Sequence, residues 1–139
     1  MGKSELVAAA LERLADDVTG LVARSRADTP AGVVDGFVAL WRELLRRSDF
    51  ADGCGVAAVA TGVGAGDDPL LDTAAATFGA WRLGLADRLV ASGMTAADAD
   101  RVAVVVIAAL EGAVVVARAE RDLDGFEVVA EHLHHLVAD

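Results

Sequence analysis

The sequence predicts an all-α bundle of five long helices and one short helix, and two observations carry this prediction. Apolar residues recur at helical spacing along almost the whole chain, and no segment alternates apolar and polar residues as a half-buried strand does. Both prolines follow a residue type that caps helices, Thr29 before Pro30 and Asp68 before Pro69. With 139 residues and no linker, the chain is expected to form one domain (1–139) with a core of its own.

The first half of the chain predicts two long helices and the short one. Residues 4–24 carry a stripe of Val and Leu at helical spacing. The second helix begins at Thr29-Pro30, carries Phe37 and Trp41, and is expected to end near residue 48. Residues 52–66 are small and rich in glycine, which predicts one short helix inside a loop.

The second half predicts three long helices with clear start and stop signals. Asp68 opens a helix that Gly93 ends, and its expected apolar stripe is Leu71, Ala75, Phe78, Trp81, Leu85 and Leu89. Thr95 caps a helix that extends to about residue 120 and is apolar on nearly every face, so we expect neighbours to cover most of it. Asp124, with Glu127 three residues later, is expected to cap the last helix.

Charge and hydropathy argue against nucleic acid and membranes as partners. The 12 Lys and Arg residues against 22 Asp and Glu residues give a net charge of −10, which repels phosphate backbones, so this chain is not expected to bind nucleic acid directly. The most apolar stretch, residues 102–117, is too short for a membrane span and contains Glu111. The single Cys54 forms no intrachain disulfide. These features predict a cytoplasmic protein without a membrane partner.

Enzyme chemistry finds little support in the residues present. The chain has no Tyr and no CxxC, GxSxG or HExxH motif, and its three histidines lie together at 132–135, where we expect a surface cluster rather than a metal site. Acid–base catalysis would fall to Glu111 or to the adjacent Asp16 and Asp17, without a second partner. We therefore expect no catalytic residue, no metal and no cofactor, and a small helical enzyme is the least favoured alternative.

The last two helices carry more apolar surface than one chain readily covers. Excess contiguous apolar surface marks an interface, and two helices meeting their two-fold copy form a four-helix bundle. The sequence thus predicts a homodimer whose interface contains Val105, Ala109, Ala113, Phe126, Val129, Leu133 and Leu136.

Aromatic residues gather on two helices of the predicted bundle. Aromatics at helical spacing more often form plain core, but here they could also line an apolar cavity with few polar groups, as ligand pockets do. Under this second interpretation the ligand-binding residues are Phe37, Trp41, Cys54, Phe78, Trp81, Arg82 and Glu111.

Glu111 stands out because a carboxylate within VVVIAALEGAVVV is costly unless it is paired. One interpretation is an ion pair with Arg82 or Arg118. The other is a polar anchor for a cationic or hydrogen-bonding ligand. Cys54 is expected to be a small buried apolar residue, since Asp49 and Asp52 nearby disfavour a reactive thiolate.

Five stretches, taken in order, resemble the C-terminal domain of TetR-family transcriptional regulators, closest to the LmrA/YxaF-like branch. They are GKSEL at 2–6, FVALWRELLRRSDFADGC at 37–54, FGAWR at 78–82, ALEGA at 109–113 and ARAER at 117–121. One departure is a Gly after Cys54, where the branch usually has Pro, which loosens that turn.

The resemblance implies the effector-binding and dimerisation domain of a bacterial regulator, in this family commonly a repressor. A small, mostly apolar effector would bind between the helices, and the last two helices would form the homodimer. The family's N-terminal helix-turn-helix is expected to be missing, because Met1 lies almost at the junction where that unit ends. The alternative function is a standalone helical dimerisation or partner-binding protein without a ligand.

Overall fold

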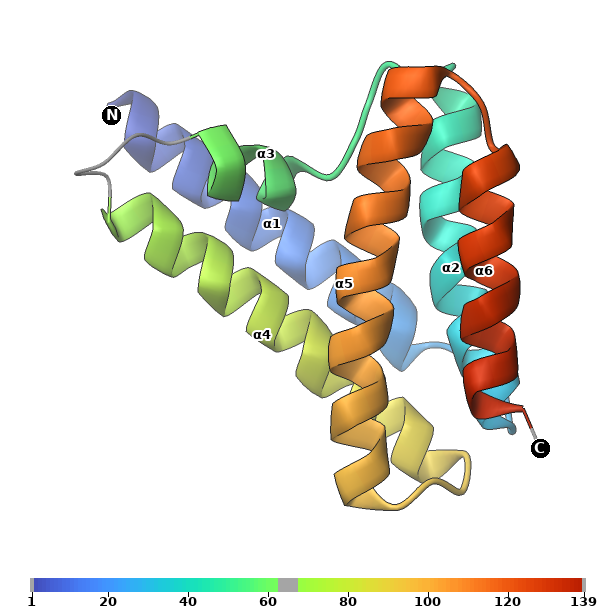
Figure 1. The fold of residues 1–139 in the computed structure, drawn as a ribbon. Coiled ribbons are helices and arrows are strands. Elements are labelled where there is room, and N and C mark those ends of the chain that lie inside the picture. Colours follow the sequence, from blue (N-terminus) through green and yellow to red (C-terminus); the bar gives the residue numbers. More distant parts are fainter. Residues whose placement is uncertain (1, 63–67, 139) are drawn as a thin grey trace.

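The structure is a computed structural model that describes residues 2–62 and 68–138. Within these residues the only regular secondary structure is helical, and the expected five long helices and one short helix are confirmed. Residues 63–66 of the predicted glycine-rich loop lie outside the described part. The helices are α1 (Lys3–Ala23), α2 (Pro30–Arg47), α3 (Gly55–Gly62), α4 (Asp68–Ala91), α5 (Ala96–Glu120) and α6 (Asp124–Val137) (Figure 1).

Local signals start and stop most of these helices as predicted. The Thr29 hydroxyl accepts a hydrogen bond from the Gly32 N–H at 3.1 Å, and the Thr95 hydroxyl accepts one from the Asp98 N–H at 3.2 Å. Gly93 ends α4 with a φ of 115°, a left-handed conformation that glycine adopts at little cost.

The start of α6 differs from the prediction. The residue that precedes the helix is Leu123, which makes no side-chain cap, and the Asp122 carboxylate accepts the hydrogen bond from the Asp124 N–H. Glu127 does not reach back to the helix start, because its carboxylate pairs with Arg42 of α2. A long-range ion pair has replaced the expected local cap.

The helices form two groups that meet at α4 (Figure 1). The helices α1 and α4 run side by side with α3 beside them, and α2, α5 and α6 form an upright three-helix group. Because α4 contacts α1, α2, α3 and α5, its side chains fill the centre of the core. Trp81, Leu85 and Leu89 of α4 are each at most 1% exposed.

The apolar stripe of α4 is shifted from the predicted one in its first half. Leu71 is 37% exposed and Ala75 is exposed, while Leu70 and Ala74 are buried instead. A shift of one residue turns a helix face by about 100°, and this shift lets the start of α4 contact α1 and α3. The buried Thr77 is satisfied because its hydroxyl donates to the Thr73 carbonyl at 2.9 Å.

Helix α5 is less covered than the sequence predicted. Val106, Leu110 and Val114 are buried, but the opposite face of the helix is exposed. Among the described residues, α5 is the one helix that is long and apolar enough to cross a membrane, and 39% of its most apolar window is buried in the chain. A buried core helix passes the same test, so this finding alone is weak evidence for a membrane span.

Candidate functional site

Four of the predicted aromatic residues form one cluster between α2 and α4. The ring centroids of Trp41 and Trp81 are 5.5 Å apart. Phe37 meets Trp41 edge-on at 6.3 Å, and Phe78 meets Trp81 edge-on at 5.7 Å. Edge-to-face contacts of this kind stabilise aromatic pairs beyond the area they bury. The cluster therefore joins the two groups of helices.

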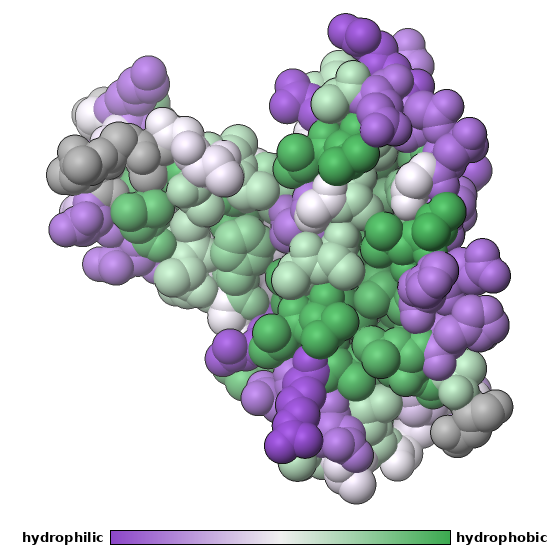
Figure 2. All heavy atoms as spheres, in the orientation of Figure 1, coloured by the Kyte–Doolittle hydropathy of each residue, from purple (hydrophilic) through white to green (hydrophobic). Residues whose placement is uncertain are grey.

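A cleft of about 1390 Å³ opens beside this cluster, between α3 and the C-terminal half of α5. Figure 2 shows a hollow in the surface there. The volume exceeds the roughly 300–1,000 Å³ of typical ligand pockets because the cleft is open to solvent. Its apolar lining comes from α1, α2, α3 and α5 and includes Leu14, Trp41, Leu44, Cys54, Ala57 and Val114.

One end of the cleft is closed by residues 49–54, which are held against α5. Asp49 and Phe50 adopt left-handed backbone conformations, with φ of 50° and 63°, and turn the chain sharply after α2. The Arg118 guanidinium then donates from Nε to the Ala51 carbonyl at 3.0 Å. Gly53 permits this approach, since a Cβ there would lie 3.3 Å from the Arg118 Cδ.

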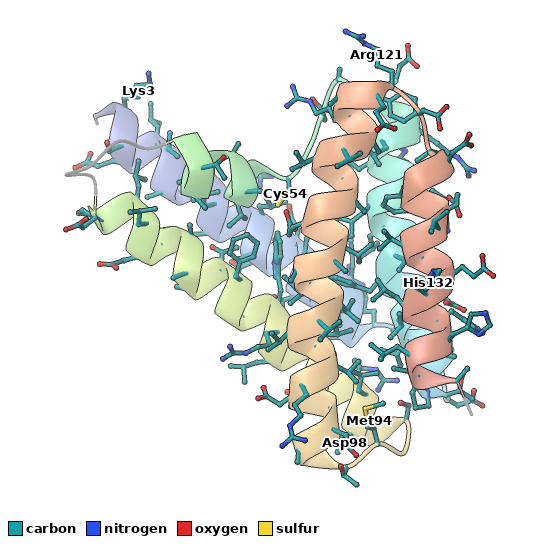
Figure 3. The ribbon with its side chains drawn as sticks, viewed as in Figure 1. Lys3, Cys54, Met94, Asp98, Arg121 and His132 are labelled. Carbon is teal, nitrogen blue, oxygen red and sulfur yellow. The ribbon has the colours of Figure 1, made fainter. Side chains whose placement is uncertain are left out.

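Cys54 lines the cleft as a buried thiol, as predicted, with only 5% of its surface exposed. Figure 3 shows it where α3 begins, facing α5. Burial, with a smaller contribution from the nearby Glu111 carboxylate, raises the pKa of the Cys54 thiol to about 12. The thiol is therefore protonated at neutral pH, which is unfavourable for redox chemistry.

Glu111 has neither of the ion-pair partners that the sequence offered. The Arg82 Nε lies 3.8 Å from the Asp100 carboxylate, and Arg118 is bound to the carbonyl of residue 51. The Glu111 Oε2 is buried and has no hydrogen-bond partner in the part of the chain that the structure describes. Burial raises the pKa of Glu111, and a hydrogen bond from the Cys54 thiol offsets this only in part.

This arrangement predicts that Glu111→Gln stabilises the chain at high pH. Because burial raises the pKa of Glu111 above its ordinary value of 4.5, the neutral acid is favoured in the folded state. Stability is therefore fully present below pH 4.5 and is lost as the pH rises through the folded pKa. We expect the variant to gain about 1–3 kcal/mol at pH 8, because the neutral amide avoids the cost of burying an unpaired charge, and to gain nothing at pH 4.

Urea denaturation at the two pH values measures this difference. Glu120→Gln is the matched control, because Glu120 is exposed at the end of the same helix. A stability difference between wild type and Glu111→Gln that does not change with pH would contradict the assignment.

The seven predicted ligand-binding residues are not all placed at the cleft. Trp41 and Cys54 line it. Trp81 contacts Trp41, Glu111 contacts Cys54, and Phe78 contacts only Trp81. Phe37 lines a separate groove of about 210 Å³ between α1 and α2. Arg82 is exposed near Asp100 and takes no part in the cleft.

Some cleft residues were missed by sequence reasoning, although helical spacing could have found two of them. Leu44 follows Trp41 by three residues and Val114 follows Glu111 by three, so each pair shares a helix face. No comparable signal marks Leu14, whose place at the cleft depends on how α1 packs against α4.

A second feature is an exposed apolar face on α5 and α6. Figure 2 shows hydrophobic residues gathered over these two helices, with hydrophilic ones along the outer side of α6. The small residues Ala108, Gly112 and Ala119 are exposed on the same face of α5. The largest exposed side chains of this face are Val104 and Val105 (both 47%), Val115 (58%), Val116 (48%), Val128 (55%) and Leu136 (52%). We call these six large residues, together with the three small ones, the α5–α6 face.

Three of the predicted interface residues lie inside the chain instead. Phe126 is 1% exposed, Leu133 4% and Ala113 7%, because this side of each helix packs into the chain's own core. Of the other four predicted positions, Val105 and Leu136 are exposed, and Ala109 and Val129 are partly buried. A partner can reach only these last four without unfolding the chain.

Polar contacts with α2 hold α6 in place, and each of the three histidines has a polar contact, His135 with Glu131 of the same helix. Arg42 binds the Glu127 carboxylate through two hydrogen bonds of 2.7 and 2.9 Å. His134 lies 2.9 Å from Asp35 of α2, and His132 bonds to the Val128 carbonyl on the outer side of α6 (Figure 3). No group of side chains that could hold a metal ion is found among the described residues.

Comparison with known proteins gives one matching family model and two similar proteins. The family model for the C-terminal domain of LmrA/YxaF-like transcriptional regulators matches residues 30–132. Two relatives, both uncharacterised HTH-type transcriptional regulators, come from the CDC 1551 / Oshkosh and H37Rv strains of Mycobacterium tuberculosis. Each is 30% identical over 141 aligned positions, which cover 98% of this chain and 72% of the relative.

Proposed function

Because the chain belongs to the TetR family of transcriptional regulators, as a C-terminal domain of the LmrA/YxaF-like type, we propose that it senses a small, mostly apolar effector in the cleft. We further propose that it forms a homodimer through the α5–α6 face and acts in the cytoplasm. The observation that carries the effector proposal is the open cleft, whose buried side chains are apolar and continue into the aromatic cluster.

The position of the cleft supports a mechanism for sensing. Its walls are α3 and α5, and α5 also carries the proposed dimer surface. An effector that moves α3 or residues 49–54 relative to α5 changes how the two copies are oriented. In an intact regulator the paired DNA-binding units must match half-sites about 34–36 Å apart, so such a change alters DNA binding.

Blocking the cleft tests this function. Ala58 lines the cleft and is exposed, so Ala58→Trp should fill the entrance without removing a core contact. We expect the uncharged dye Nile red to bind wild type with enhanced emission and to bind Ala58→Trp at least about 10-fold more weakly, a loss of roughly 1.4 kcal/mol. A bound dye should also raise the melting temperature, since it binds the folded state only.

Ala60→Trp is the matched control, because Ala60 is exposed on the same helix but does not line the cleft. Equal dye binding by the two variants would place the site elsewhere. If neither the dye nor any apolar compound in a thermal-shift screen binds, the exposed α5–α6 face favours the second candidate function, a dimerisation module without a ligand.

A further inference from the structure

Three buried polar atoms near the cleft have no hydrogen-bond partner among residues 2–62 and 68–138. They are the indole Nε1 atoms of Trp41 and Trp81 and the carboxyl Oε2 of Glu111. An unsatisfied buried polar group costs about 1–3 kcal/mol, and folded proteins contain few of them. A fourth such atom, Nε of Arg88, belongs to a side chain that is already bound, since its Nη2 donates to the Ala27 carbonyl at 2.9 Å.

The three atoms come from helices that pack on one another. Trp41 is on α2, Trp81 on α4 and Glu111 on α5, and each of these helices contacts the other two. The two indole rings touch, with centroids 5.5 Å apart, and are 4% and 1% exposed. Trp41 lines the cleft together with Cys54, whose thiol contacts the Glu111 carboxyl. Trp41 therefore lies on the wall of the cleft, and Trp81 and Glu111 lie directly behind it, each in contact with a residue that lines the cleft. We call this region the inner end of the cleft.

We propose that the inner end of the cleft binds an uncharged ligand with an apolar body and at least two acceptor oxygens. These oxygens accept hydrogen bonds from the indole N–H groups of Trp41 and Trp81, and Glu111 donates a further hydrogen bond in its protonated form. The proposal deepens the proposed function, because it takes the cleft to be the effector site and specifies the chemistry of the effector.

The arrangement of donors disfavours a charged ligand. A cation would match an ionised Glu111 but would leave both indole N–H groups unsatisfied. An anion would match the N–H groups but would lie against the Glu111 carboxyl group, and the two arginines of the cleft lining, Arg118 and Arg121, are matched in number by Asp49 and Asp52. Burial raises the pKa of Glu111, which favours the neutral form of the carboxyl group, the form that can donate a hydrogen bond.

Three probes of matched size test the proposal by calorimetry. They are a diacetylnaphthalene, the diethylnaphthalene with the same substitution pattern, and a naphthyltrimethylammonium ion. The diketone should bind wild type about 10-fold more tightly than the hydrocarbon, as two net hydrogen bonds imply, and also more tightly than the cation. Glu111→Gln keeps a donor at this position, so it should change the affinity for the diketone by less than about 3-fold.

Trp41→Phe and Trp81→Phe remove the N–H donors but keep an aromatic ring. Each should weaken diketone binding by about 3- to 10-fold and leave hydrocarbon binding unchanged. The wild-type chain supplies a test that needs no variant. Both indole N–H resonances should move downfield when the diketone binds, and neither should do so with the hydrocarbon.

The remaining outcomes separate this proposal from the proposed function. Tighter binding of the cation, lost in Glu111→Gln, would overturn the proposal and indicate a carboxylate anchor. Equal binding of all three probes, blocked by Ala58→Trp, would also overturn it and leave the cleft as an effector site. If none of the three probes binds while Nile red still binds the cleft, the proposal is also overturned and the cleft remains an effector site. If Nile red fails too, the proposed function fails, and this inference fails with it.

Discussion

We expect replacement of Val116 with glutamate to make the chain monomeric at concentrations where the wild type forms the proposed dimer. Val116 is 48% exposed on the α5–α6 face. A two-fold interface contains this residue twice, once from each copy of the chain, so both glutamates would lie in the interface. Burying and opposing two carboxylates costs several kcal/mol, so we expect the dimer dissociation constant to rise by about 100-fold or more. Sedimentation equilibrium measures this change directly.

Leu83→Glu is the matched control, because Leu83 is 60% exposed on α4, outside the α5–α6 face. It should leave the dimer intact, and circular dichroism should show both variants to be folded. A wild-type chain that is monomeric at micromolar concentration would refute the homodimer. A substitution at Leu133 is a poor test, because that side chain is 4% exposed and its loss would destabilise the chain itself.

Trp81→Ala will destabilise the fold more than any exposed substitution. Trp81 is 1% exposed, lies on the central helix α4 and contacts both Trp41 and Phe78. Truncating a buried tryptophan removes its apolar burial and leaves a cavity, which typically costs about 3–5 kcal/mol. Urea denaturation should show a loss of this size in the free energy of unfolding.

The control for this loss is Leu83→Ala, two residues along the same helix and exposed to solvent. It should change the free energy of unfolding by no more than about 0.5 kcal/mol. A loss below about 1 kcal/mol for Trp81→Ala would mean that the aromatic cluster is loosely packed, contrary to its ring contacts.

Sequence reasoning succeeded where the signal is local. Thr29, Thr95 and Gly93 act within one turn of the chain, so the ends of their helices were predicted correctly. It failed at α6, where Glu127 meets Arg42, a residue 85 positions away in the sequence. No local pattern reveals such a partner.

The same distinction holds for the candidate site and the dimer face. The aromatic cluster was predicted because four aromatic residues lie at helical spacing on two neighbouring helices, so their rings are expected to meet. The other residues of the cleft depend on how residues 49–54 pack against α5, which the Arg118 contact to the Ala51 carbonyl fixes in three dimensions. Phe126 and Leu133 were assigned to the interface because they share one apolar side of α6 with Val129 and Leu136. Only contact with α2 and α5 decides which part of that side is covered by the chain itself.

Helix α5 takes part in both proposed activities at once. Val115 lines the cleft and is also 58% exposed on the α5–α6 face, within one rigid rod about 37 Å long. Any effector whose binding favours one position of this rod must change the free energy of pairing. By thermodynamic reciprocity, pairing must then change the effector's affinity by the same factor. The half-saturation point of the sensor will therefore shift with the amount of protein in the cell.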